Sequence, residues 1–110
     1  MVELRLYIVQ RATAVLMIPF ILIHIAVIFY AISDGLTANE ILARTGGSLG
    51  WGLFYTFFVL LAAAHGAIGV RSVLREWTAM GEAASDIFAI GFCVVLVLLG
   101  LRAVVAVVFT

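Results

Sequence analysis

The stretch from Thr45 to Val70, TGGSLGWGLFYTFFVLLAAAHGAIGV, decides the fold class. It contains no Asp, Glu, Lys or Arg, and it exceeds the roughly 20 apolar residues that a helix needs to cross a bilayer. Two further stretches are similar: 12–33 has no charged residue, and 86–110 has only Asp86 at its start and Arg102 near its end. A segment that spans lipid must satisfy its own backbone hydrogen bonds, so each stretch is predicted to be a helix.

The composition of the whole chain also points to lipid as the solvent. Of 110 residues, 66% are hydrophobic and 11% are charged, against about 25% charged in a typical soluble domain. Six arginines balance six carboxylates, so the chain has no net positive charge that would attract a nucleic acid. Cys93 is the only cysteine, which excludes an intrachain disulfide and a cysteine-based zinc site. We therefore predict an all-α integral membrane protein, one domain over 1–110, with transmembrane helices at about 11–33, 50–74 and 85–109.

Short polar connections separate the predicted helices. The first helix is expected to end at Asp34, and Thr37 is expected to begin a short interfacial helix over 38–44. A glycine pair then breaks the chain before the second long helix. Gly81 breaks the next connection, and Ser85 is expected to be the N-cap of the third long helix. The first ten residues lack a small-residue cleavage site, so no removable signal peptide is expected.

The arginines predict an orientation in the membrane. Four of them are expected on one side, because they precede the first helix or end the second: Arg5, Arg11, Arg71 and Arg75. Arg44 and Arg102 lie toward the other side. The positive-inside rule then places the N-terminus in the cytoplasm, or in the equivalent compartment of an organelle, and the C-terminus outside.

His65 is the residue that most suggests chemistry. It lies six residues before Arg71, which is roughly 9 Å below the membrane boundary, and ionisable side chains at that depth usually have a function. Its helical neighbours Ala62, Gly66 and Gly69 are small. They either admit another helix or leave a flat slot for a porphyrin with neutral imidazole as axial ligand. The alternative is a neutral histidine that is hydrogen-bonded to a neighbouring helix.

His24 lies deeper, 13 residues after Arg11 and roughly 20 Å along the helix axis. Antiparallel helices would therefore place His24 and His65 at depths that differ by roughly 10 Å. Axial ligands of one haem must face each other at nearly the same height, so we expect that the two histidines do not share an iron. If both bind haem, each needs a partner from another chain. The alternative for His24 is a packed or carbonyl-bonded histidine.

Other polar side chains lie near the predicted boundaries. Arg11 and Arg71 could pair with haem propionates or lipid phosphates, and simple interfacial anchoring is the alternative. Trp77 could be an interfacial belt residue or could donate its indole N–H to a quinone carbonyl, with Glu76 beside it. Arg102 is expected to extend toward the outer boundary. The alternative is that it pairs with a propionate of a second, outer haem. No nucleophile and base are arranged around either histidine, so no catalytic residue is predicted.

Two motifs then resemble a known family. The first is Arg11-Ala12-Thr13-Ala14, at the start of the first predicted span. The second is His65-Gly66-Ala67-Ile68-Gly69, with Glu76 and Trp77 eleven and twelve residues after the histidine. Over nearly its whole length the chain resembles the small, cytochrome b-type membrane anchor of bacterial succinate dehydrogenase (succinate:quinone oxidoreductase).

The resemblance implies roles for these residues. His65 would be an axial ligand of haem b, with the second ligand from the other anchor subunit, and Arg11 would lie near the quinone and propionate region. Trp77 stands where the family has a quinone-contacting Tyr, and it lacks the acidity of a phenol. Glu76 stands where the family often has Asp. His24, with Ile18-Pro19 upstream, resembles the first-helix histidine of two-haem relatives, which implies one haem b or two.

The resemblance also implies partners and a location. They are a second membrane-anchor subunit, an iron–sulfur subunit and a flavoprotein subunit at the bacterial inner (cytoplasmic) membrane. The complex would pass electrons from succinate to quinone, and this chain alone would not be an enzyme. A quinol:fumarate reductase anchor, with or without haem, is the alternative. A small multidrug-type transporter would need four spans and a carboxylate buried in the first, whereas Glu3 is expected outside the membrane.

Overall fold

The computed structural model describes residues 2–109, and every regular element in that range is a helix. Three long helices have the length and composition to cross a membrane: α1 (Val2–Asp34), α3 (Leu49–Trp77) and α4 (Glu82–Val108). The short α2 (Ala38–Thr45) lies between α1 and α3. These elements confirm the three predicted spans and the short helix. Thr110, the last residue of the third predicted stretch, lies outside the described residues.

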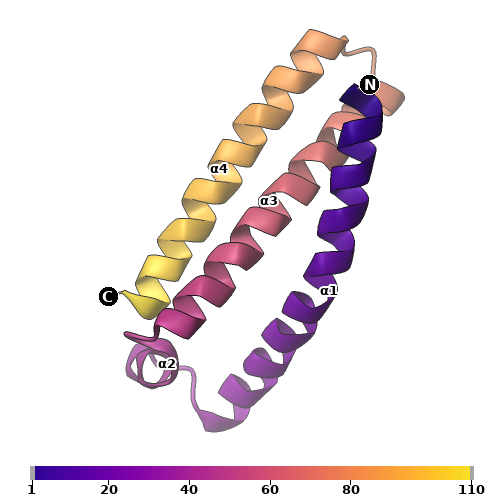
Figure 1. Ribbon diagram of the computed structural model, residues 1–110. Coiled ribbons are helices and arrows are strands. Elements are labelled where there is room, and N and C mark those ends of the chain that lie inside the picture. Colours follow the sequence, from indigo (N-terminus) through magenta and orange to yellow (C-terminus); the bar gives the residue numbers. More distant parts are fainter. Residues whose placement is uncertain (1, 110) are drawn as a thin grey trace.

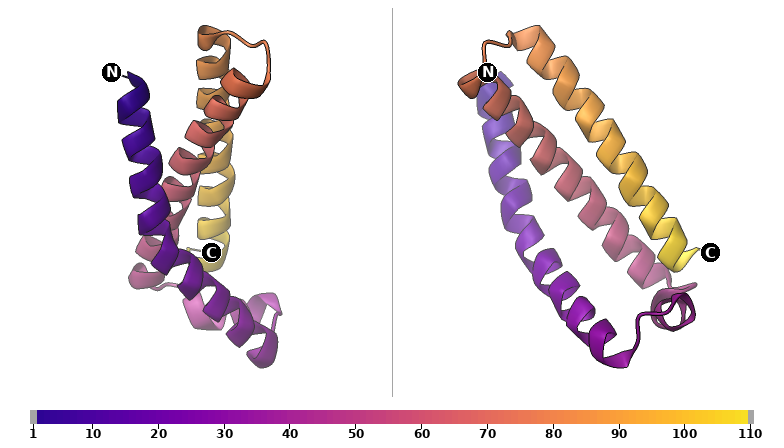
Figure 2. Two further views of the ribbon diagram at one scale, coloured as in Figure 1. Left: turned by 90° about the vertical axis from the view of Figure 1, so that its right-hand side faces the viewer. Right: turned by 180° about the vertical axis from the view of Figure 1, so that it is seen from behind.

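The central helix is α3, because both α1 and α4 pack along it (Figure 1). Successive long helices run in opposite directions, so the bundle is 48 Å long and has two distinct ends. The N-terminus, the end of α3 and the start of α4 share one end, which we call the inner end. The outer end holds α2 and the end of α4, and α1 is inclined to the other two long helices (Figure 2). Arg71 and Arg75 lie near the inner end with the N-terminus, as the sequence predicts.

The first helix begins much earlier than predicted, at Val2 rather than near residue 11. Glu3 lies in its first turn, where a carboxylate favours the positive end of the helix dipole. The same carboxylate pairs with Arg71 and Arg75 of α3. Glu3 thus lies in the first turn of α1 at the inner end of the bundle, and its charge is matched by arginines far along the chain.

Polar caps begin two of the helices. The Thr37 hydroxyl oxygen accepts the Glu40 N–H at 3.2 Å, which confirms the predicted start of α2. Ser48 caps α3 in the same way. The prediction for the third long helix is wrong: Gly81 is the N-cap of α4, and Ser85 lies inside the helix and is fully buried. The small Ser85 side chain lets α4 approach its neighbour closely.

Small residues also bring α3 and α4 together. The buried residues of the two helices include Ala63 and Ala67 of α3 and Ala89 of α4. Helices in lipid associate through close packing, since the acyl chains around them are as apolar as their own side chains. The tightest position is Gly100, where an added Cβ would lie 2.4 Å from Cγ1 of Val59.

Replacing Gly100 with alanine should therefore push α4 away from α3. Overpacking of this kind typically costs about 1–3 kcal/mol, which exceeds the roughly 1 kcal/mol that alanine gains over glycine in a helix. The measurement is the heat-denaturation midpoint of the purified membrane complex. The matched control is Gly91→Ala on the same helix, where an added Cβ meets nothing within 4 Å. Equal midpoints for the two variants would contradict the packing argument.

The outer end is closed by bonds between α2 and α4. The Thr45 hydroxyl lies 2.6 Å from the Val107 carbonyl oxygen, and the Gly47 N–H donates to the Val108 carbonyl oxygen at 2.6 Å. The last carbonyls of a helix have no partner within the helix. Thr45 at the end of α2 and Gly47 just after it supply donors for two such carbonyls at the end of α4.

Candidate functional site

His65 faces α1 from near the middle of α3. Its Nδ1 atom lies 3.1 Å from the backbone carbonyl oxygen of Gln10 and 3.4 Å from Oγ1 of Thr13. A carbonyl oxygen can only accept, so Nδ1 carries the ring proton and donates it to Gln10. Nε2 then presents its lone pair, and the hydrogen bonds of this ring among residues 2–109 all use Nδ1.

Thr13 supports this arrangement from α1. Its side chain is buried, and its hydroxyl lies 2.8 Å from the carbonyl oxygen of Val9 and 3.0 Å from that of Gln10. The hydroxyl has a single proton, which these two carbonyls share, and Oγ1 keeps lone pairs that can accept from Nδ1 of His65. The two motifs that carry the family resemblance thus meet in space. Sequence reasoning missed this contact because the two residues are 52 positions apart.

The small residues beside His65 are used for packing within the chain. A Cβ at Gly66 would lie 3.6 Å from Leu96 and 3.8 Å from Phe92, both of α4. A Cβ at Gly69 would lie 3.1 Å from the side-chain nitrogen of Gln10. Of the two interpretations of these residues, close helix approach is the one that the structure shows.

His24 lies in a different environment, among aromatic rings toward the outer end. Its ring packs edge-on against Phe58 and Tyr55, with centroids 5.3 and 6.0 Å away. Its Nδ1 is buried and has no hydrogen-bond partner among residues 2–109. His24 is therefore a packed histidine, and its Nδ1 is not bonded to any carbonyl among residues 2–109. It also lines an apolar cavity of about 380 Å³ that all four helices bound.

The two histidines occupy separate levels of the bundle. His24 meets α3 at Tyr55 and Phe58, whereas His65 lies at least seven residues farther along that helix. At 1.5 Å per residue this separation is about 10 Å or more. The prediction that the two histidines lie at different depths is confirmed, and whether either ligates iron stays a prediction.

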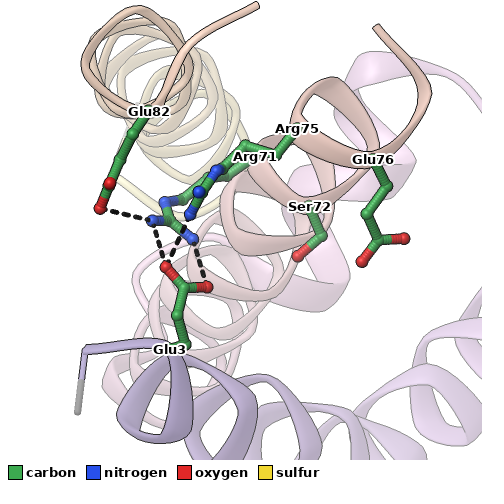
Figure 3. Close-up of a pocket in the computed structure, with 6 residues that line it drawn as sticks. All are labelled: Glu3, Arg71, Ser72, Arg75, Glu76 and Glu82. Carbon is green, nitrogen blue, oxygen red and sulfur yellow. Dashed lines mark hydrogen bonds and ion pairs between the residues drawn. The ribbon is translucent and has the colours of Figure 1, made fainter.

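Arg71 is the centre of a charged cluster at the inner end (Figure 3). Its side chain is only 7% exposed, and its two terminal nitrogens lie 3.1 and 2.8 Å from the two carboxylate oxygens of Glu3. Its Nε donates to Asp86 of α4, and Glu82 lies 3.9 Å away. Arg75 adds a second cation on Glu3, at 2.7 Å. One guanidinium thus joins all three long helices.

The sequence suggested haem propionates or lipid phosphates as partners of Arg71, whereas the structure shows carboxylates of the same chain. The Arg71 nitrogens already face these carboxylates, so a haem propionate or lipid phosphate would have to compete with them. Sequence reasoning missed the pairing because Glu3 and Asp86 are 68 and 15 positions away. A role for Arg71 toward a cofactor stays a prediction.

Arg11 lies deeper than the sequence suggested. It follows Gln10, which contacts His65, and it comes eight residues after Glu3, or about 12 Å along α1. Its guanidinium is 5.6 Å from the centroid of the Tyr7 ring. Arg11 and Arg71 lie in the same half of the bundle, as the sequence predicts, but it is Glu3 and not Arg11 that lies beside Arg71.

The two predicted quinone residues end α3. Trp77 is 81% exposed, and Glu76 lines a pocket of about 470 Å³ beside the Arg71 cluster. Figure 3 shows the Glu76 carboxylate turned away from the guanidinium groups. Trp77 lies twelve residues, or about 18 Å along the axis, from His65. Arg102 is exposed on α4. Quinone contact by Trp77 and Glu76 stays a prediction.

Comparison with known proteins places the chain in a family. Curated proteins and solved structures give no significant match to the chain. The family model of the succinate dehydrogenase/fumarate reductase transmembrane subunit matches residues 2–101, which include both histidines and the two motifs. The chain therefore belongs to the succinate dehydrogenase/fumarate reductase transmembrane subunit family and is an integral membrane subunit of such a complex.

Proposed function

We propose that this chain is the haem b-binding anchor subunit of succinate dehydrogenase (complex II), with His65 as an axial ligand. One observation carries the proposal: the Nδ1–H of His65 is directed at the Gln10 carbonyl oxygen, 3.1 Å away. Histidines that bind metals almost always donate their other ring N–H in this way, which fixes the tautomer and raises the basicity of the ligating nitrogen. His65 has this support within its own chain.

His24 lacks comparable support. A haem ligand that binds through Nε2 carries its proton on Nδ1, and Nδ1 of His24 is buried without a partner among residues 2–109. An unpaired buried N–H typically costs about 1–3 kcal/mol. We therefore propose that His65 holds the one haem of this chain's site, with the second axial ligand from the partner anchor subunit. When bound there, haem b would accept and pass on single electrons.

Other residues would serve the cofactors from the inner half. Arg11 is our preferred partner for a haem propionate, because it is exposed at the level of His65 while Arg71 is already paired. The Trp77 indole N–H would donate to a quinone carbonyl, with the Glu76 carboxylate as an acceptor beside it. The iron–sulfur and flavoprotein subunits would bind at the inner end, on the cytoplasmic side of a bacterial inner membrane.

A fumarate reductase anchor without haem is the second candidate. The description of the matched family covers both kinds of complex, and the three membrane-spanning helices suit an anchor in either. In that case His65 would be a packing residue bonded to α1. The haem content of the purified complex separates the two candidates.

The test is the ratio of haem to flavin in the purified complex, with haem measured by the pyridine haemochrome assay. We expect a ratio near one, because only His65 has a supported tautomer. A ratio near two would contradict our assignment of His24 as a packing residue. A ratio near zero would overturn the proposed function and leave the haem-free anchor.

A further inference from the structure

We infer that Glu3 is a positioning residue for His65: its ion pair with Arg71 sets the position of α1 along α3 and so holds the Gln10 carbonyl against the imidazole. This inference rests on the proposed role of His65 as a haem ligand. Glu3 lies outside both motifs that carry the family resemblance, and the sequence suggested no function for it.

Glu3 and Gln10 lie on the same face of α1. Seven residues separate them, which is close to two full turns of an α-helix. Both contact α3: Glu3 through the guanidinium of Arg71, and Gln10 through His65 and the close approach to Gly69. A shift of α1 along its axis would therefore move both contacts together.

The contact between Glu3 and Arg71 resists such a shift because it is bidentate. Each carboxylate oxygen of Glu3 faces one terminal nitrogen of Arg71, at 2.8 and 3.1 Å. Arg71 has little freedom to follow, since its side chain is buried and its Nε is bonded to Asp86 of α4. Displacement of α1 by one turn, about 5.4 Å, would separate these groups.

Contacts at the outer end do little to hold the inner half of α1. The Phe20 ring stacks on Phe54, with centroids 5.0 Å apart, but Pro19 lies inside α1 between this contact and Gln10. Proline removes a backbone hydrogen bond and loosens a helix at that point. Lipid adds no hydrophobic force that would press α1 onto α3. Directional contacts of the inner half must therefore set its position.

The first experiment measures the position of α1 directly. Gln10→Cys and Gly69→Cys are combined in a Cys93→Ser background, and cross-linking by a short bifunctional thiol reagent is quantified in membranes that contain the assembled complex. The structure predicts a cross-link, because the Gln10 side chain reaches Gly69: its terminal nitrogen would lie 3.1 Å from a Cβ there. We expect at least a twofold lower yield with Glu3→Gln. The matched control is Glu82→Gln, which removes a carboxylate 3.9 Å from the same arginine and should leave the yield unchanged.

The second experiment uses the haem as a probe of His65. A weaker bond from Nδ1 to the Gln10 carbonyl makes the imidazole a poorer electron donor to iron, so the reduction potential should rise. We expect Glu3→Gln to raise the potential of the haem and change its electron paramagnetic resonance signature, and Glu82→Gln to change neither. Glu3→Asp, which keeps the charge, should restore part of the original values.

The outcomes separate this inference from the proposed function. If His65→Ala keeps its haem, the proposed function fails, and the cross-linking yield alone then tests whether Glu3 positions α1. If His65→Ala loses its haem but Glu3→Gln keeps the original cross-linking and potential, the inference is overturned. The inference is also overturned if Glu3→Gln lowers the amount of complex but the complex that does assemble has the original cross-linking yield and haem potential.

Discussion

His65→Ala should yield an assembled complex that has lost the haem b absorbance. Alanine cannot ligate iron, and the structure shows no second imidazole at this level among residues 2–109 that could replace it. The variant should still fold, because the Gln10 carbonyl keeps the Thr13 hydroxyl at 3.0 Å when the imidazole is removed. The measurement is the reduced-minus-oxidised difference spectrum of the purified complex, normalised to flavin.

His24→Ala is the matched control for this loss. It removes the other imidazole from the same three-helix unit, in a region about 10 Å or more from His65 along α3. We expect its haem content to equal that of the original protein. Haem retained in full by His65→Ala would show that His65 is a packing histidine bonded to α1.

Arg71→Ala should be the most destabilising single change at the inner end. It removes the side chain that, among residues 2–109, bonds carboxylates of both α1 and α4, and it leaves the carboxylates of Glu3, Glu82 and Asp86 close together. Like charges in such proximity repel each other, and Arg75 is the cation that still pairs with Glu3 among residues 2–109. We expect Arg71→Ala to lower the heat-denaturation midpoint of the complex clearly further than Arg75→Ala lowers it.

Arg75→Ala is the natural comparison for this change. Arg75 bonds the same Glu3 carboxylate at 2.7 Å, but its side chain is 33% exposed and joins only two helices. Exposed ion pairs of this kind contribute at most about 1 kcal/mol. The shift in midpoint should therefore be small. Similar midpoints for the two variants would show that the buried position of Arg71 has no special role in stability.

The helices of this protein were largely predictable from its sequence, because lipid imposes a length and an apolar composition on each span. The cap at Thr37 was also predictable, since a hydroxyl side chain three residues before Glu40 is a local signal. The start of α1 was not predictable, because Glu3 is stabilised by an arginine 68 positions away. Ser85 was mistaken for a cap because local sequence does not show which face a helix turns toward its neighbour.

The residues of the candidate site were predictable from the sequence, but the contacts between them were not. His65 and Thr13 both lie in motifs that the sequence suggested, but their contact depends on how α1 packs against α3. The internal partners of Arg71 depend on that same packing. Its role toward haem, like that of His24, Arg11, Glu76 and Trp77, is a prediction that ligand measurements on the whole complex will decide.

The bonds from Thr45 and Gly47 to the end of α4 bear on the order of membrane insertion. Their acceptors, the carbonyls of Val107 and Val108, are translated long after α1 and α2 have left the ribosome. Until α4 arrives, the Gly47 N–H of the connecting segment lacks its native acceptor, and lipid offers no substitute. The nascent hairpin of α1 and α3 must therefore keep this segment hydrated at the surface. Arrival of α4 then releases that water and completes the outer end.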